Sequence, residues 1–77
     1  MKQNQIVLKH LLEGKSITQL EAMNEYGIMR LGARIFELIQ DGYPIKKQMV
    51  TVRNRLGEPC MVAKYYMEEN NEFAEVN

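Results

Sequence analysis

Four arginines have a type and spacing that favour one kind of chemistry. Arg30 and Arg34 are about one helical turn apart, so a helix would place both guanidinium groups on one face. Arg53 and Arg55 flank Asn54 in a stretch with the composition of a turn. A guanidinium group can pair with a phosphate or donate two hydrogen bonds to guanine O6 and N7. The arginines therefore indicate nucleic-acid contact, and solvated surface charge is the simpler alternative.

The charged residues are unevenly distributed, although the 77 residues have a formal net charge of zero. The last ten residues contain four glutamates and no basic residue, which leaves residues 1–67 with a net charge of +4. This distribution excludes a histone-like coating of positive charge and indicates a basic middle. We expect one folded domain over residues 1–67 and an acidic, flexible tail over residues 68–77.

Residues suited to catalysis or metal binding are scarce. The chain has one histidine and one cysteine, and it contains no metal-ligand spacing, glycine-rich phosphate loop or Ser-His-Asp set. We expect His10 to be structural, at the surface or half-buried, and Cys60 to be a packing or partly exposed residue. The sequence thus predicts no enzymatic activity, no metal and no cofactor.

Two observations bear on location. The single cysteine excludes an intrachain disulfide and is compatible with a reducing cytoplasm. No apolar run approaches the roughly 20 residues of a membrane span, and the polar N-terminus does not have the pattern of a signal peptide. We therefore expect a cytoplasmic protein that does not associate with membranes.

The elements that must position the arginines follow from apolar periodicity and from capping residues. A first helix is predicted over residues 3–13, ended by Gly14, with an inner face of Val7, Leu8, Leu11 and Leu12. Thr18 and Glu21 match a capping box, which predicts a short second helix over residues 19–26. Its inner face is expected to hold Leu20 and Met23.

A turn and a third helix come next. Gly27 can adopt positive φ without steric cost, so we expect a tight turn there. The third helix is predicted over residues 29–40, with a buried stripe of Leu31, Ile35, Leu38 and Ile39. Its exposed side would present Arg30, Gly32, Ala33, Phe36, Glu37 and Gln40, with Met29 and Arg34 near the boundary. A glycine within a helix indicates close approach, either to DNA or to a neighbouring helix.

After Pro44 the helical periodicity of apolar residues ends and strand-forming residues begin. Residues 45–54 and 61–67 are rich in strand-forming residues, and the turn between them contains Gly57, so they predict a β-hairpin. Helix, short helix, turn, helix and hairpin make up a mostly α fold with a β-hairpin (α+β). The predicted architecture is a winged helix-turn-helix with three helices and a two-stranded wing.

This layout assigns a set of candidate DNA-contacting residues. The second helix of a helix-turn-helix enters the major groove, and the helix before it contacts the backbone. The tip of the wing would reach the backbone or the minor groove, unless its charges only keep the turn soluble. The candidate residues are Thr18, Gln19, Met29, Arg30, Gly32, Ala33, Arg34, Glu37, Arg53, Asn54 and Arg55.

Three stretches carry a family resemblance. Residues 16–22, residues 26–35 and residues 41–45 resemble the small helix-turn-helix domain family that is common in bacteriophage and prophage proteins. The similarity extends over residues 3–66. It implies a winged helix-turn-helix fold and a DNA-binding role, and it places Met29, Arg30, Gly32, Ala33 and Arg34 at or near the DNA.

Two functional hypotheses follow. The first is duplex DNA binding by a small phage-type regulator of transcription or recombination, with the third helix in the major groove and the wing on the backbone or minor groove. The second is a protein-interaction module that binds a host or phage protein, based on the zero net charge, the acidic tail and Phe36. A homodimer through Ile6 and Leu12 of the first helix is a further expectation.

Overall fold

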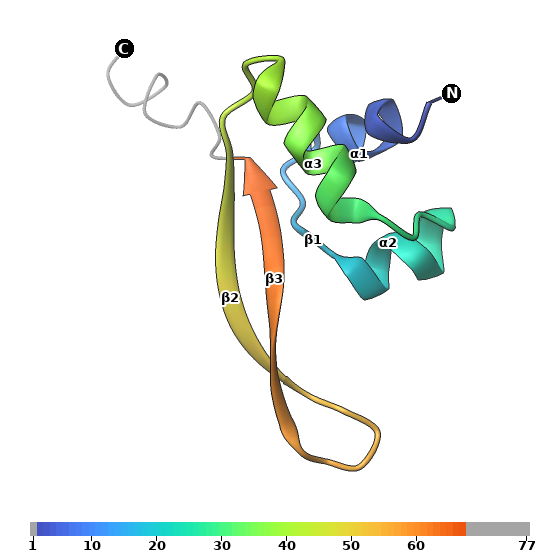
Figure 1. Ribbon diagram of the computed structural model, residues 1–77, viewed down its shortest axis with the longest axis vertical. Helices are drawn as coiled ribbons and strands as arrows, with labels where there is room; N and C mark the ends of the chain where they lie inside the picture. The colour runs from blue at the N-terminus through green and yellow to red at the C-terminus, as the bar shows by residue number, and fades with distance from the viewer. Residues whose placement is uncertain (1, 68–77) are drawn as a thin grey trace.

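The chain forms a helical body from which a long antiparallel hairpin projects (Figure 1). The computed structural model describes residues 2–67. Its elements are α1 (Gln3–Leu12), β1 (Ile17–Thr18), α2 (Gln19–Tyr26), α3 (Leu31–Gln40), β2 (Ile45–Arg53) and β3 (Pro59–Met67). None of these helices is long and apolar enough to cross a membrane. The acidic tail predicted for residues 68–77 lies outside the described residues.

The boundaries of α2 have the predicted chemistry. Thr18 is the N-cap: its Oγ1 accepts a hydrogen bond from the Glu21 N–H at 3.3 Å. The Glu21 carboxylate accepts one from the Thr18 N–H at 2.9 Å, which completes the capping box. Gly27 ends the helix in the left-handed conformation, with φ of +69°. The capping box and the turn glycine are therefore confirmed.

The third helix starts later than the sequence predicted. Arg30 is its N-cap and has a non-helical backbone, with φ of −126° and ψ of 64°. Met29 lies in the connection from α2, so the predicted helical start at Met29 is wrong by two residues. The physical reason is the length of the turn: residues 27–30 are needed to redirect the chain from α2 into α3.

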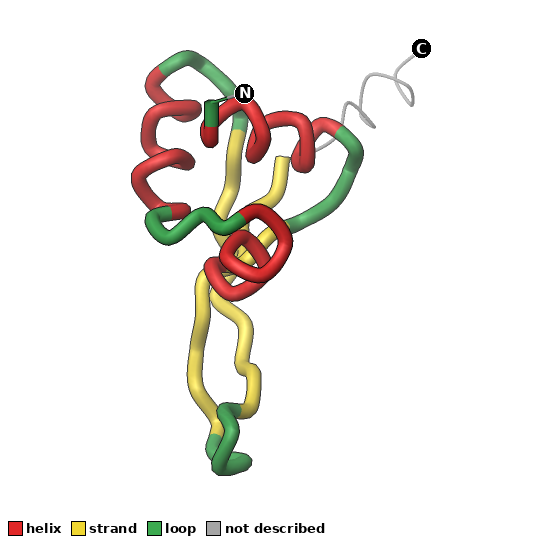
Figure 2. Tube along the Cα trace, turned by 90° about the vertical axis from the view of Figure 1, so that its right-hand side faces the viewer, coloured by secondary structure: helices red, strands yellow, loops and turns green. Residues whose placement is uncertain are grey.

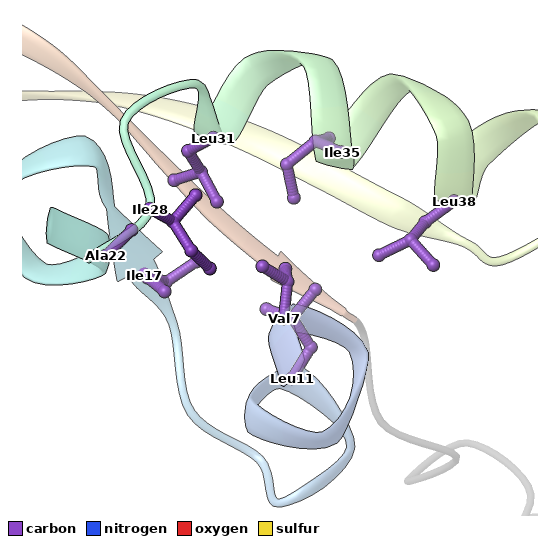
Figure 3. Packing of buried hydrophobic residues seen from close by; sticks show 8 residues of the cluster. All are labelled: Val7, Leu11, Ile17, Ala22, Ile28, Leu31, Ile35 and Leu38. Atoms are coloured by element: carbon purple, nitrogen blue, oxygen red, sulfur yellow. The ribbon is translucent and has the colours of Figure 1, made fainter. Parts of the chain in front are cut away.

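Eight apolar side chains form the core between the helices and the base of the sheet (Figure 3). Burying a side chain of leucine size contributes about 1.5–3 kcal/mol, so this cluster is the main source of stability. Ile45, Tyr65 and Met67, at the base of the hairpin, pack against it. The core residues are Val7, Leu11, Ile17, Ala22, Ile28, Leu31, Ile35 and Leu38.

Four residues predicted to face inward are exposed instead, namely Leu12, Leu20, Met23 and Ile39. The second helix has only eight residues and is in the core through Ala22, whose small side chain lets the helix approach closely. Periodicity alone could not select this face, because two turns of helix contain too few apolar positions.

His10 is buried, contrary to the expectation of a surface or half-buried position. Its Nε2 lies 3.0 Å from the Ser16 carbonyl oxygen, and its Nδ1 lies 2.7 Å from the Tyr26 hydroxyl. Because a carbonyl can only accept, Nε2 donates to Ser16, and in the neutral ring Nδ1 accepts from Tyr26. The histidine thus joins the end of α1, the loop before β1 and the end of α2.

The sheet has three antiparallel strands in the order β1-β3-β2, so the predicted two-stranded wing is wrong by one strand. The added strand pairs Ile17 with Tyr65 and Thr18 with Lys64. Ile17 is fully buried, so the backbone beside it needs hydrogen-bond partners, and β3 offers an unpaired edge. A strand of two residues has no periodicity that a sequence could reveal.

The hairpin extends well beyond the helices (Figure 2). β2 and β3 pair over nine residues, from Ile45 with Met67 to Arg53 with Pro59. Gly32 of α3 lies beside Tyr65, whose partner in β2 is Lys47. Residues 48–53 then continue outward by about 20 Å at the usual rise of a strand.

Candidate nucleic-acid interface

The Gln19 side chain joins the two helices of the helix-turn-helix. Its Nε2 donates to the Ile28 carbonyl at 2.8 Å, and its Oε1 accepts from the Leu31 N–H at 2.9 Å. Leu31 is the first residue of α3, where a backbone N–H has no partner inside the helix. Gln19 therefore orients α3 against α2. Its amide, predicted to contact DNA, is engaged within the protein.

The surface of α3 opposite the core is the candidate recognition surface, which we call the outer face of α3. Three buried residues on one side of the helix define the opposite side at 3.6 residues per turn. Apolar groups are prominent there: Met29 is 71% exposed and Phe36 is 60% exposed. The outer face, including the connection before the helix, consists of Met29, Arg30, Ala33, Phe36, Glu37 and Gln40.

Arg34 does not lie on the outer face. It is turned toward the start of α1, and its Nη2 forms an ion pair with the Glu37 Oε2 at 3.3 Å. The Arg34 side chain is only 29% exposed. Arg30 and Arg34 nevertheless line one open cleft of about 380 Å³ beside Gln3. The structure therefore brings the two predicted arginines together at an edge of the helix, where Glu37 offsets part of their charge.

Gly32 faces the wing rather than the outer side of the helix. A Cβ at this position would lie 3.9 Å from the Tyr65 hydroxyl oxygen, an ordinary van der Waals distance. The close neighbour of the helix is therefore a strand, which neither sequence-based alternative for this glycine included. An apolar groove of about 440 Å³ lies between the N-terminal turn of α2, Gly32 and the hairpin, where Val52, Arg53 and residues 62–65 line it. Thr18 and Leu20 line its helical side.

The tip of the wing is braced by its own side chains. The Asn54 Oδ1 accepts hydrogen bonds from the N–H groups of Leu56 and Glu58, both at 2.9 Å. Arg53 Nη1 donates to the Gly57 carbonyl at 2.6 Å. Within residues 2–67, the Arg55 side chain makes no hydrogen bond or ion pair. Asn54, a predicted DNA contact, thus shapes the turn, and Arg55 extends from it.

Two features of this surface were not found from the sequence. The clamp by Gln19 connects residues 9 and 12 positions apart, which no local pattern shows. Leu56 is 82% exposed at the tip of the wing. Its signal was present in the sequence, because a leucine between polar turn residues is unusual, but only the polar and basic residues of the tip were considered as DNA contacts.

A protein-family model described as a winged helix-turn-helix domain matches residues 2–70. No curated protein and no solved structure gives a significant match. Helix-turn-helix domains generally bind DNA through the second helix of the pair, so the match indicates DNA binding as the general function. Because the match covers nearly the whole chain, and because three helices and a wing follow in the expected order, the chain belongs to the winged helix-turn-helix domain family.

Proposed function

We propose that this domain binds duplex DNA with the outer face of α3 in the major groove and the wing over the adjacent backbone and minor groove. The observation that carries the proposal is the position of the exposed outer face, held by Gln19 against α2 and accompanied by a wing that projects about 20 Å beyond Tyr65. Helix and wing could therefore contact one duplex at two grooves.

The outer face offers chemistry for base edges. Arg30 can donate to guanine O6 and N7 or pair with a phosphate, and Gln40 can form two hydrogen bonds with adenine. The methyl group of Ala33 and the ring of Phe36 suit the C5-methyl group of thymine. Thr18, at the N-terminus of α2, lies where helix-turn-helix proteins bind a phosphate.

The finer role we propose is that of a small, non-enzymatic regulator of the phage or prophage type, working in a bacterial cytoplasm. The resemblance of residues 26–35 and 41–45 to that family supports it. The only histidine is buried and engaged with Tyr26 and Ser16, which fits a binding role better than catalysis. A single module buries roughly 600–1,000 Å², so tight binding would require a homodimer or neighbouring copies.

The proposal is tested by the salt dependence of DNA binding. Fluorescence anisotropy would compare the wild type with Arg30→Ala and Arg55→Ala on a mixed-sequence duplex over a series of salt concentrations. Each substitution that removes one phosphate contact should make the log–log slope less negative by about 0.9. Arg34→Ala should change the slope less, because Arg34 is paired with Glu37.

Lys9→Ala is the matched control, because Lys9 is an exposed basic residue on α1 away from the outer face. It should leave the slope unchanged. An equal change of the salt-dependence slope in Lys9→Ala and Arg30→Ala would contradict the proposed DNA-contacting surface. Absence of duplex binding by the wild type at low salt would contradict the function itself.

A protein-interaction module is the second candidate, because Met29 and Phe36 present apolar surface at the same place. The two functions differ in the behaviour of Phe36→Glu. In a DNA-binding domain this change repels the duplex at every sequence. In an interaction module it dissociates a stoichiometric protein complex that survives nuclease treatment, while the wild type shows no affinity for duplex DNA at low salt.

A further inference from the structure

Leu56, at the tip of the wing, has no structural explanation in the fold. It is 82% exposed, more than any other large apolar residue among residues 2–67. The turn that contains it, residues 54–58, lies at the far end of the hairpin, clear of the helices (Figure 2), and Leu56 is not among the core residues. A single exposed leucine is ordinary on a broad surface. At a protruding tip between polar residues, it is the apolar group nearest to a molecule that contacts the end of the wing.

The backbone around Leu56 is rigid. The Asn54 side chain accepts hydrogen bonds from the N–H groups of Leu56 and Glu58, and the Gly57 N–H donates to the Asn54 carbonyl at 2.9 Å. Arg53 adds a bond from its guanidinium group to the Gly57 carbonyl. The turn is therefore organised before binding, and little conformational entropy remains to be lost when Leu56 enters a confined space.

The charged residues beside Leu56 indicate which kind of binding site it could enter. Arg53 and Arg55 lie on one side of it in the chain, and Glu58, on the other side, lies 3.4 Å from the Asn54 Nδ2. The tip therefore has a net positive charge, and the Arg55 guanidinium group is available to a ligand. A narrow minor groove has an enhanced negative potential that attracts inserted arginine side chains.

The length of the wing agrees with this location. The tip extends about 20 Å beyond the level at which Tyr65 meets α3. One turn of duplex DNA measures about 34–36 Å, so the minor groove next to an occupied major groove is about 17 Å away. The wing is thus long enough for Leu56 to reach the neighbouring minor groove when α3 lies in the major groove.

We propose that Leu56 is an apolar wedge that enters the minor groove, partly separates two stacked base pairs and bends the duplex away from the wing. This inference rests on the proposed DNA binding and adds a DNA-bending activity to it. Proteins that insert such wedges bend DNA by roughly 20–90°. Arg55 would flank the wedge and pair with the phosphates of the widened groove.

The test measures bending and binding separately. Förster transfer between the two ends of a duplex of about 30 base pairs with a flexible TA step at its centre reports the bend, and 2-aminopurine at that step reports unstacking. The wild type should shorten the end-to-end distance and raise the 2-aminopurine signal. Leu56→Ala should still bind but leave the duplex straight. Leu56→Met, which keeps an apolar side chain of similar size, should restore the bend.

Leu20→Ala is the matched control, because Leu20 is an exposed leucine on α2 in the helical body. It should bend DNA as the wild type does. Binding by the wild type without bending would overturn the wedge alone and leave Leu56 for contact with a protein. Equal bending by Leu56→Ala would also overturn it. No duplex binding by the wild type would overturn the proposed function as well, so the two failures are distinguishable.

Discussion

At the scale of single residues, Gln19 contributes both to the stability of the fold and to the orientation of α3, the candidate DNA-recognition helix. Both halves of its amide group are satisfied by backbone groups of the turn and of α3. A buried or half-buried backbone group that loses its partner costs about 1–3 kcal/mol. The residue that orients the candidate recognition helix is therefore also one that the fold needs.

Substitution of Gln19 should destabilise the domain without any contact to DNA. We expect Gln19→Ala to lower the free energy of unfolding by about 1–3 kcal/mol, measured by urea denaturation. Gln19→Glu should also destabilise, because a carboxylate still accepts from the Leu31 N–H but cannot donate to the Ile28 carbonyl. Gln40→Ala, at an exposed position of α3, is the control and should change stability little. Unchanged unfolding of Gln19→Ala would contradict the clamp.

The contacts around Gln19 show which interactions the sequence could predict and which it could not. The capping box of Thr18 and Glu21 was predicted because its two partners are three positions apart. The role of Gln19 was not, because its partners lie beyond Gly27. Arg30 and Arg34 line one cleft, and Arg34, expected near the boundary of the exposed side, is turned toward the start of α1. The N-cap position of Arg30 was not predicted, because it depends on the late start of the helix at Leu31.

At the scale of elements, Gly27 and Gly32 differ in what an added side chain would encounter. At Gly27 it would strain the backbone, and at Gly32 it would contact a neighbouring strand. Gly27→Ala should destabilise by about 1–2 kcal/mol, because its φ of +69° strains any residue with a Cβ. Gly32→Ala should stabilise by up to about 1 kcal/mol, because alanine is the better helix former and the added Cβ meets only Tyr65 at 3.9 Å. Thermal unfolding of both variants gives the comparison. Destabilisation by Gly32→Ala would show that the helix cannot tolerate a side chain toward the wing.

The turn of the wing is the second element with a measurable consequence. Asn54→Ala removes the acceptor for two backbone N–H groups, so amide hydrogen exchange at Leu56 and Glu58 should accelerate, while exchange in the core stays slow. Asn54→Asp keeps an acceptor oxygen for both N–H groups and should retain most of the protection. Equal protection in Asn54→Ala would mean that the tip is ordered by other contacts.

Elements with a strong local signal were predicted, and elements that depend on distant partners were not. The helix over Gln3–Leu12 and the hairpin were expected because periodicity and turn residues define them. β1 was missed, since it exists only through its pairing with β3. The exposed position of Leu20 was missed because Ala22, rather than a large residue, fills the space between α2 and the core.

At the scale of the whole molecule, the shape limits the size of a DNA site. The described residues measure 48 × 29 × 19 Å, with the hairpin along the long axis. The longest dimension exceeds one turn of duplex DNA, about 34–36 Å, and is well short of two turns. In the proposed geometry, with α3 in one major groove and the wing over the adjacent minor groove, one copy therefore covers about one turn.

Hydroxyl-radical footprinting should show this limit. We expect protection on one face of the duplex over about one helical turn, 10–10.5 base pairs, at low protein concentration. A protected region twice as long would require two copies and would agree with the homodimer expected from the sequence. Protection around the whole circumference of the duplex would contradict the proposed geometry.

The two-residue strand β1 also has a consequence for how the protein is made. Ile17 pairs with Tyr65, which the ribosome adds 48 residues later. At about 5–20 residues per second, a nascent chain waits roughly 2–10 s before this pairing can form. The three helices emerge first, but until the hairpin has returned from its tip, β1 has no partner strand and Tyr65 and Met67 do not yet cover the core. Prematurely terminated products that lack β3 would expose apolar surface and become substrates for chaperones and proteases, so only complete domains would reach DNA.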